Sequence, residues 1–115
     1  MSSFTIQSRT SGSIHILELN GELDAHTASH LEDSLKSLIE EKQFNIVVNF
    51  SRLDYISSAG LGVFMAYIED VRSLGGDIKL SNMSDKVYNV FDLLGFPTLY
   101  DILHTEEEAI VKFTI

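Results

Sequence analysis

Apolar and polar residues alternate one by one in the first part of the chain, with the period of a β-strand. The alternation covers residues 4–9 and resumes over 14–19, after the small and polar turn residues Ser11–Ser13. These two stretches predict a β-hairpin. The alternation breaks at Asn20–Asp24, where we expect the second strand to end.

From Thr27 onward the apolar residues recur at steps of three and four, which is the spacing of an amphipathic helix. The same spacing returns twice further along the chain. Glycine follows the second run at Gly75 and the third at Gly95, as is common at the carboxyl end of a helix. The three predicted helices cover residues 27–42, 58–74 and 84–94, and the apolar spacing of the second begins at Leu61.

Short runs between these helices predict strands. Residues 44–50 are rich in β-branched side chains, residues 77–81 alternate, and Leu99–Ile102 resembles a last short strand. Thr105 with Glu108 forms a capping box for a closing helix. The order predicts an α/β fold with a mixed sheet of four to five strands and about four helices. The sheet is expected to be antiparallel at its opening hairpin and otherwise mostly parallel.

The segment Ser51–Gly60 is the longest polar loop after a predicted parallel strand, where binding sites gather in such sheets. It leads into a helix. Ser57 has the chemistry of a helix N-cap, and Ser58 then falls at the first helical position with its side chain toward water. A pair of serines before a helix often serves only as a cap. A phosphate on Ser58 would add about −1.5 to −2 charge at the positive end of the helix dipole and leave the fold intact.

Composition narrows the class of protein. A chain of 115 residues with one Pro and no Cys or Trp predicts a single domain over residues 1–115. Seventeen acidic against eight basic residues give a net charge of −9, so nucleic acids and anionic membranes are not expected partners. Without Cys there are no disulfides and no thiolate metal sites. Neither a secretory leader nor a long apolar segment is evident, so we expect a cytoplasmic protein.

Four segments in this order resemble the STAS domain of bacterial anti-anti-sigma factors: Gly21–Asp24, Ile46–Asn49, Leu53–Gly62 and Gly75–Gly76. The resemblance implies a binding protein that is not an enzyme and uses no cofactor or metal. Its unmodified form would bind an anti-sigma factor that is also its serine kinase, with a GHKL-type ATP-binding fold, and so free a sigma factor. Phosphorylation would block this binding, and a metal-dependent serine phosphatase would restore it.

The resemblance also assigns residues. The phosphate acceptor of the family lies two residues before Gly-Leu-Gly, which is Ser58 here. The family often has Asp immediately before the acceptor, whereas this chain has Ser57, so Ser57 stays as a second candidate and cap geometry favours Ser58. The residues expected to bind the partner are Glu22, Asp24, Ser57, Ser58, Gly60 and Leu61.

Other functions fit the sequence less well. One alternative within the same family is a scaffold subunit of a transport or stress-sensing complex, with no phosphorylation cycle. Met65 stands where a dinucleotide fingerprint requires its third glycine, and Ile56 stands where a serine hydrolase elbow requires its first. His26 and His30 have the spacing of a zinc pair but no evident third ligand, so we interpret them as surface side chains.

Overall fold

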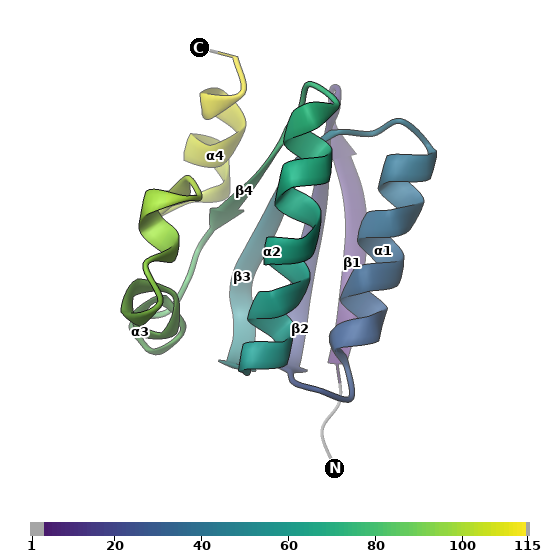
Figure 1. Cartoon of the computed structure of the whole chain (residues 1–115). Coiled ribbons are helices and arrows are strands. Elements are labelled where there is room, and N and C mark those ends of the chain that lie inside the picture. Colours follow the sequence, from purple (N-terminus) through teal and green to yellow (C-terminus); the bar gives the residue numbers. More distant parts are fainter. Residues whose placement is uncertain (1–3, 115) are drawn as a thin grey trace.

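A computed structural model describes residues 4–114 (Figure 1). The strands are β1 (Phe4–Ser11), β2 (Ile14–Leu23), β3 (Asn45–Ile56), β4 (Asp77–Ser81) and β5 (Ile102–Leu103). The helices are α1 (Ala28–Glu40), α2 (Ser58–Ser73), α3 (Asp85–Leu93), the short 3-10 helix η1 (Phe96–Thr98) and α4 (Glu106–Lys112).

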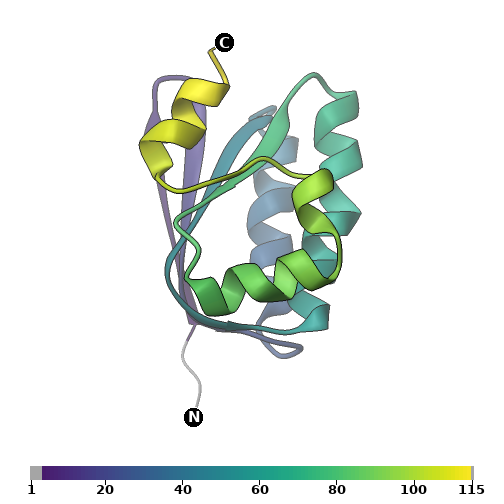
Figure 2. The same cartoon turned by 90° about the vertical axis from the view of Figure 1, so that its left-hand side faces the viewer.

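The strands form one five-stranded sheet in the order β1-β2-β3-β4-β5. Strands β1 and β2 are antiparallel, and each later neighbour pair is parallel. Helices α1 and α2 lie side by side on one face of the sheet, and α4 lies on the opposite face (Figures 1 and 2). The predicted fold class, with its antiparallel opening hairpin and parallel remainder, is confirmed.

The two faces of the sheet bury different cores. The main core fills the space between the sheet and α1, α2 and α3, where the ring of Phe91 meets that of Phe50 edge-on with centroids 5.6 Å apart. A smaller core lies under α4, where Ala109 packs over Ile16 and Val47. Successive side chains of a strand point to opposite faces, so one strand supplies both cores.

Two strands are longer than the sequence predicted. Strand β3 continues to Ile56, so the expected polar loop from Ser51 is mostly strand, and β2 continues through residues 20–23. The pairing between them shifts register twice, once directly after Gly21. A register shift interrupts the alternation of buried and exposed side chains, and Leu53 and Ile56 are both buried although they are three residues apart. This is why the pattern suggested that both strands had ended.

The expected strand over residues 99–102 is also wrong in its extent. Only its last residue is in a strand, because β5 is Ile102–Leu103. Tyr100, two residues before β5, packs in the main core instead. The ring of Tyr100 stacks on that of Phe96, with centroids 5.6 Å apart and planes 3° from parallel. Aromatic packing therefore decides the path of the chain between α3 and β5.

The hydroxyl of Tyr100 is buried and has no hydrogen-bond partner within residues 4–114, and burial raises its pKa. A buried donor without a partner lowers stability. We therefore expect Tyr100→Phe to increase the free energy of unfolding in urea by about 1 kcal/mol. The control is Tyr67→Phe, which removes a hydrogen bond to Glu32 of 3.2 Å and should bring no gain. A loss of stability in Tyr100→Phe would show that the hydroxyl makes a favourable contact.

Polar contacts attach the start of α4 to the sheet. Thr105 caps the helix as predicted, accepting from the Glu108 amide at 3.1 Å. Glu106, in the first turn of α4, also reaches the sheet. Its carboxylate accepts from the guanidinium of Arg9 in β1 and from the amide of Asn49 in β3, each at 2.9 Å.

A second polar cluster lies on the same face of the sheet. Lys79 is only 7% exposed and donates to Asp77 at 2.9 Å and to Asp101 at 2.7 Å. Its ammonium group also lies 4.8 Å from the centroid of the Phe113 ring. Two carboxylates and an aromatic face therefore compensate for the loss of water around this cation.

These contacts make stability depend on pH. The hydrogen bond from Arg9 lowers the pKa of Glu106, and that from Lys79 lowers the pKa of Asp101, while burial opposes both. A carboxylate with a lowered folded-state pKa stabilises the fold above its ordinary pKa, which is 4.5 for Glu106 and 3.8 for Asp101. That contribution is lost as the pH falls through the lower folded-state value.

We expect Glu106→Gln to make the acid loss of stability shallower. Thermal unfolding between pH 3 and pH 7 should show the melting temperature of the variant falling less than that of the unchanged chain, because one stabilising ionisation is gone. Glu107→Gln, at the exposed next position, is the matched control and should keep the original slope. Identical slopes for both variants would show that the Arg9 contact is not coupled to folding.

Candidate functional site

Helix α2 begins almost directly after strand β3, with Ser57 alone between them. Ser57 is in an extended conformation, its hydroxyl accepts from the Gly60 amide at 3.4 Å, and its carbonyl accepts from the Leu61 amide at 3.1 Å. Ser57 is therefore the N-cap, as predicted. Ser58 is the first residue of the helix, and it is exposed. The first amides of a helix lack partners within it, so the hydroxyl of Ser58 lies at a positively polarised end.

The end of β2 holds this corner in place. The Ser57 amide donates to the Leu23 carbonyl at 2.9 Å, which adds one more hydrogen bond after the Leu23 and Ile56 pair. Gly60 lies directly above these two side chains. A Cβ atom on Gly60 would be 2.8 Å from Cγ of Leu23 and 3.2 Å from Cγ1 of Ile56. The absence of a side chain at Gly60 allows α2 to begin this close to the sheet.

We expect Gly60→Ala to destabilise the chain by about 1–3 kcal/mol, because the added methyl group must displace a fully buried leucine. The matched control is Gly62→Ala in the same helix. No atom lies within 4 Å of a Cβ atom at Gly62, and the higher helix propensity of Ala should stabilise the chain by up to about 1 kcal/mol. Urea unfolding of both variants gives the comparison, and equal effects would contradict the close packing at Gly60.

The turn between β2 and α1 lies beside this corner (Figure 1). The carboxylate of Asp24 accepts from the amides of His26 at 2.9 Å and Thr27 at 3.1 Å, and the Thr27 hydroxyl donates to the Glu22 carbonyl at 2.8 Å. Loss of water contact raises the pKa of Asp24, but these donors outweigh it and hold the pKa below its ordinary value. Asp24 therefore keeps its charge and shapes the turn that leads into α1.

The residues predicted to bind a partner come together, but at different depths. Glu22 and Ser58 are exposed, whereas Asp24 and Ser57 are half-buried and hydrogen-bonded to backbone amides. Gly60 is buried, and the side chain of Leu61 is only 2% exposed. These last two positions therefore support the corner from below.

Tyr55 is a surface residue of this corner that the sequence interpretation missed. It pairs with Glu22 across β2 and β3 and is 44% exposed. An exposed tyrosine offers both apolar area and a hydroxyl to a partner protein. The signal that could have found it is the continuation of β3, since a strand through residue 55 places this side chain next to Glu22.

A metal site at His26 and His30 gains no support from the structure. His30 lies on α1 with its ring centroid 6.3 Å from that of Phe4, and His26 lies in the preceding turn. Within residues 4–114, no three His, Cys, Asp or Glu side chains are grouped so that they could hold a metal ion. No helix in that part of the chain has the length and apolar character needed to cross a membrane.

The fold and this corner define a STAS domain, and the model of that family matches residues 5–109. The chain therefore belongs to the STAS domain family. It is 30% identical over 95 residues to BtrV of Bordetella bronchiseptica, to which the role of an anti-sigma factor antagonist is assigned, and this match covers 83% of the chain and 82% of BtrV. It is 26% identical over 107 residues to the anti-sigma-B factor antagonist of Staphylococcus aureus, covering 93% of the chain and 96% of the relative.

Solved structures show the same fold. The anti-sigma factor antagonist SpoIIAA in its unphosphorylated form superposes with a TM-score of 0.80 at 27% identity, covering 96% of this chain and 95% of SpoIIAA. The phosphorylated form of SpoIIAA, a Bacillus cell fate determinant, superposes with a TM-score of 0.73 at 26% identity, covering 96% and 98%. SpoIIAA thus keeps this fold in both states.

Proposed function

We propose that this chain is an anti-sigma factor antagonist in which phosphorylation of Ser58 switches partner binding off. The role of antagonist is supported by its relatives, which are named anti-sigma factor antagonists. The observation that carries the second part is an exposed serine at the start of α2, in a corner built by α2 and the turn after β2. The chain acts by binding, not by catalysis. Its unphosphorylated form binds an anti-sigma factor and so frees a sigma factor.

Charge explains how one phosphate controls the contact. A hydroxyl at Ser58 is small and neutral and fits a close interface, whereas a phosphate adds about −1.5 to −2 charge. A charge buried in an interface without a cationic partner costs several kcal/mol. A loss of about 4 kcal/mol weakens binding roughly a thousandfold. The phosphate would meanwhile lie at the favourable end of α2, so the fold itself loses nothing.

The local geometry favours Ser58 over Ser57 as the acceptor. The Ser57 hydroxyl accepts the Gly60 amide, and its side chain is half-buried, so a phosphate there would disturb the cap. Ser58 is exposed and makes no such contact with the helix. That SpoIIAA has been solved with and without phosphate supports a modification that this fold tolerates.

The partners in this proposal are proteins. One is an anti-sigma factor with serine kinase activity and a GHKL-type ATP-binding fold, and the other is a metal-dependent serine phosphatase that removes the phosphate. The chain would work in the cytoplasm as a single domain, without binding nucleic acid or membranes. Its net charge of −9 is consistent with a protein partner and opposes a nucleic acid.

Intact mass measurement after incubation with the partner kinase, Mg²⁺ and ATP tests the acceptor. We expect a shift of one phosphate, about 80 Da, in the unchanged chain and in Ser57→Ala, and none in Ser58→Ala. A shift that survives Ser58→Ala and disappears in Ser57→Ala would assign the acceptor to Ser57. If affinity capture recovers a transporter ATPase or permease in place of a kinase, the scaffold role replaces the proposed one.

Calorimetric titration with the anti-sigma factor tests the switch. Ser58→Asp should weaken binding by at least tenfold, less than a phosphate does because it adds a single charge, and should leave the melting temperature nearly unchanged. Ser37→Asp adds the same charge at an exposed position near the far end of α1 and should bind normally. Equal affinities for the two variants would refute an interface around Ser58.

A further inference from the structure

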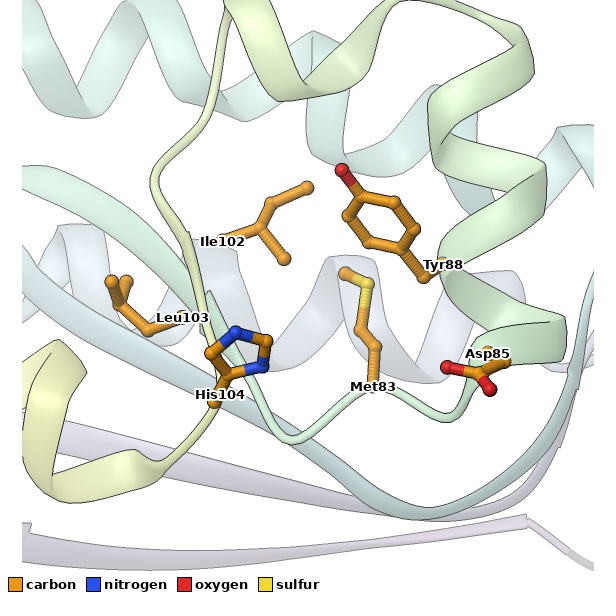
Figure 3. A pocket seen from close by; sticks show the side chains of 6 residues that line it. All are labelled: Met83, Asp85, Tyr88, Ile102, Leu103 and His104. Atoms are coloured by element: carbon orange, nitrogen blue, oxygen red, sulfur yellow. The ribbon is translucent and has the colours of Figure 1, made fainter.

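A cavity lies beside the last strand of the sheet, near the carboxyl ends of β4 and β5 (Figure 3). Strands β4 and β5 are parallel neighbours, and the chain leaves both of them at this edge. Ligands of open parallel sheets commonly bind outside such strand ends. The cavity has a volume of about 400 Å³, within the range of small-molecule sites. It is lined by Met83, Asp85, Tyr88, Ile102, Leu103 and His104.

Three of the six lining residues, Met83, Ile102 and Leu103, are apolar, and Tyr88 adds an aromatic ring. Figure 3 shows Met83 between Ile102 and the ring of Tyr88, with the three side chains turned toward a common space. Tyr88 is 37% exposed although it lies on α3 next to the main core. Methionine adapts its shape to a ligand, and an aromatic face attracts cations. This wall therefore suits a compact apolar body, and the tyrosine ring favours one that carries positive charge.

The polar groups of the cavity select the charge of a ligand. Asp85 is the acidic side chain of the lining, and neither Lys nor Arg is part of it. In Figure 3 the Asp85 carboxylate lies at the rim below Tyr88, while His104 lies at the rim on the other side of Met83. An anionic ligand would meet the carboxylate without a compensating cation. A net charge of −9 on the chain adds to this preference for positive ligands.

We propose that this cavity binds a small organic cation, namely a protonated amine on an aromatic or branched apolar body. The ammonium group would lie between the Asp85 carboxylate and the Tyr88 ring. The apolar body would pack on Met83 and Ile102. This site is separate from the proposed phosphorylation site, and it stands whether or not Ser58 is modified.

Titration of the full ¹⁵N-labelled chain with benzylammonium, followed by NMR, tests the site. We expect saturable shifts of the amide resonances of residues 83–88 and 102–104, with weaker binding of benzyl alcohol and none of benzoate. These three probes share one ring and differ in charge. Shifts that do not saturate, or an equal response to benzylammonium and benzoate, would overturn the proposal.

Asp85→Asn isolates the charge without removing the helix cap, because the Val87 amide donates to the Ser84 hydroxyl and not to Asp85. The variant should bind benzylammonium about fivefold more weakly and benzyl alcohol unchanged. Asp92→Asn, at the other end of α3, is the matched control and should bind like the unchanged chain. Equal benzylammonium affinities for Asp85→Asn and Asp92→Asn would reject the carboxylate as the ligand-selecting group.

Discussion

The packing of α2 onto the end of the β2 and β3 pair is the constraint on which the candidate site depends. Leu23 is fully buried beneath Gly60, and the Leu23 carbonyl accepts the Ser57 amide at 2.9 Å. This hydrogen bond fixes where β3 ends and where α2 can begin. The position of the exposed Ser58 hydroxyl therefore depends on Gly60 and Leu23, which are both buried.

Most of the fold followed from periodic patterns in the sequence. Helices α1, α2 and α3 each have an apolar stripe with a clear end, so their positions could be predicted within a few residues. The errors occurred where tertiary contacts override local pattern. Register shifts hid the second half of β3, and stacking of Tyr100 on Phe96 replaced the start of a strand. Neither the register shift nor the stacking contact produces a regular spacing of apolar residues, because each depends on segments that meet only in the folded chain.

The residue types of the candidate site could be predicted from the sequence better than the burial of each side chain. Ser57 as a cap and Ser58 as an exposed neighbour follow from the pattern of polar and apolar residues at a helix start. The burial of Leu61 follows from its place on the apolar stripe of α2, but sequence could not show that Asp24 is half-buried and accepts from the amides of its own turn. The burial of a residue at this corner depends on how the end of β2 pairs with β3. The register shift in that pairing could not be predicted from the sequence.

The contact between Arg9 and Glu106 joins residues 97 positions apart in the chain. At ribosomal speeds of about 5–20 residues per second, Arg9 is synthesised roughly 5–20 s before its carboxylate partner. Until α4 is made, Ile16 and Val47 lack the cover of Ala109. The second core can therefore form only after α4 has been synthesised, so it is completed late.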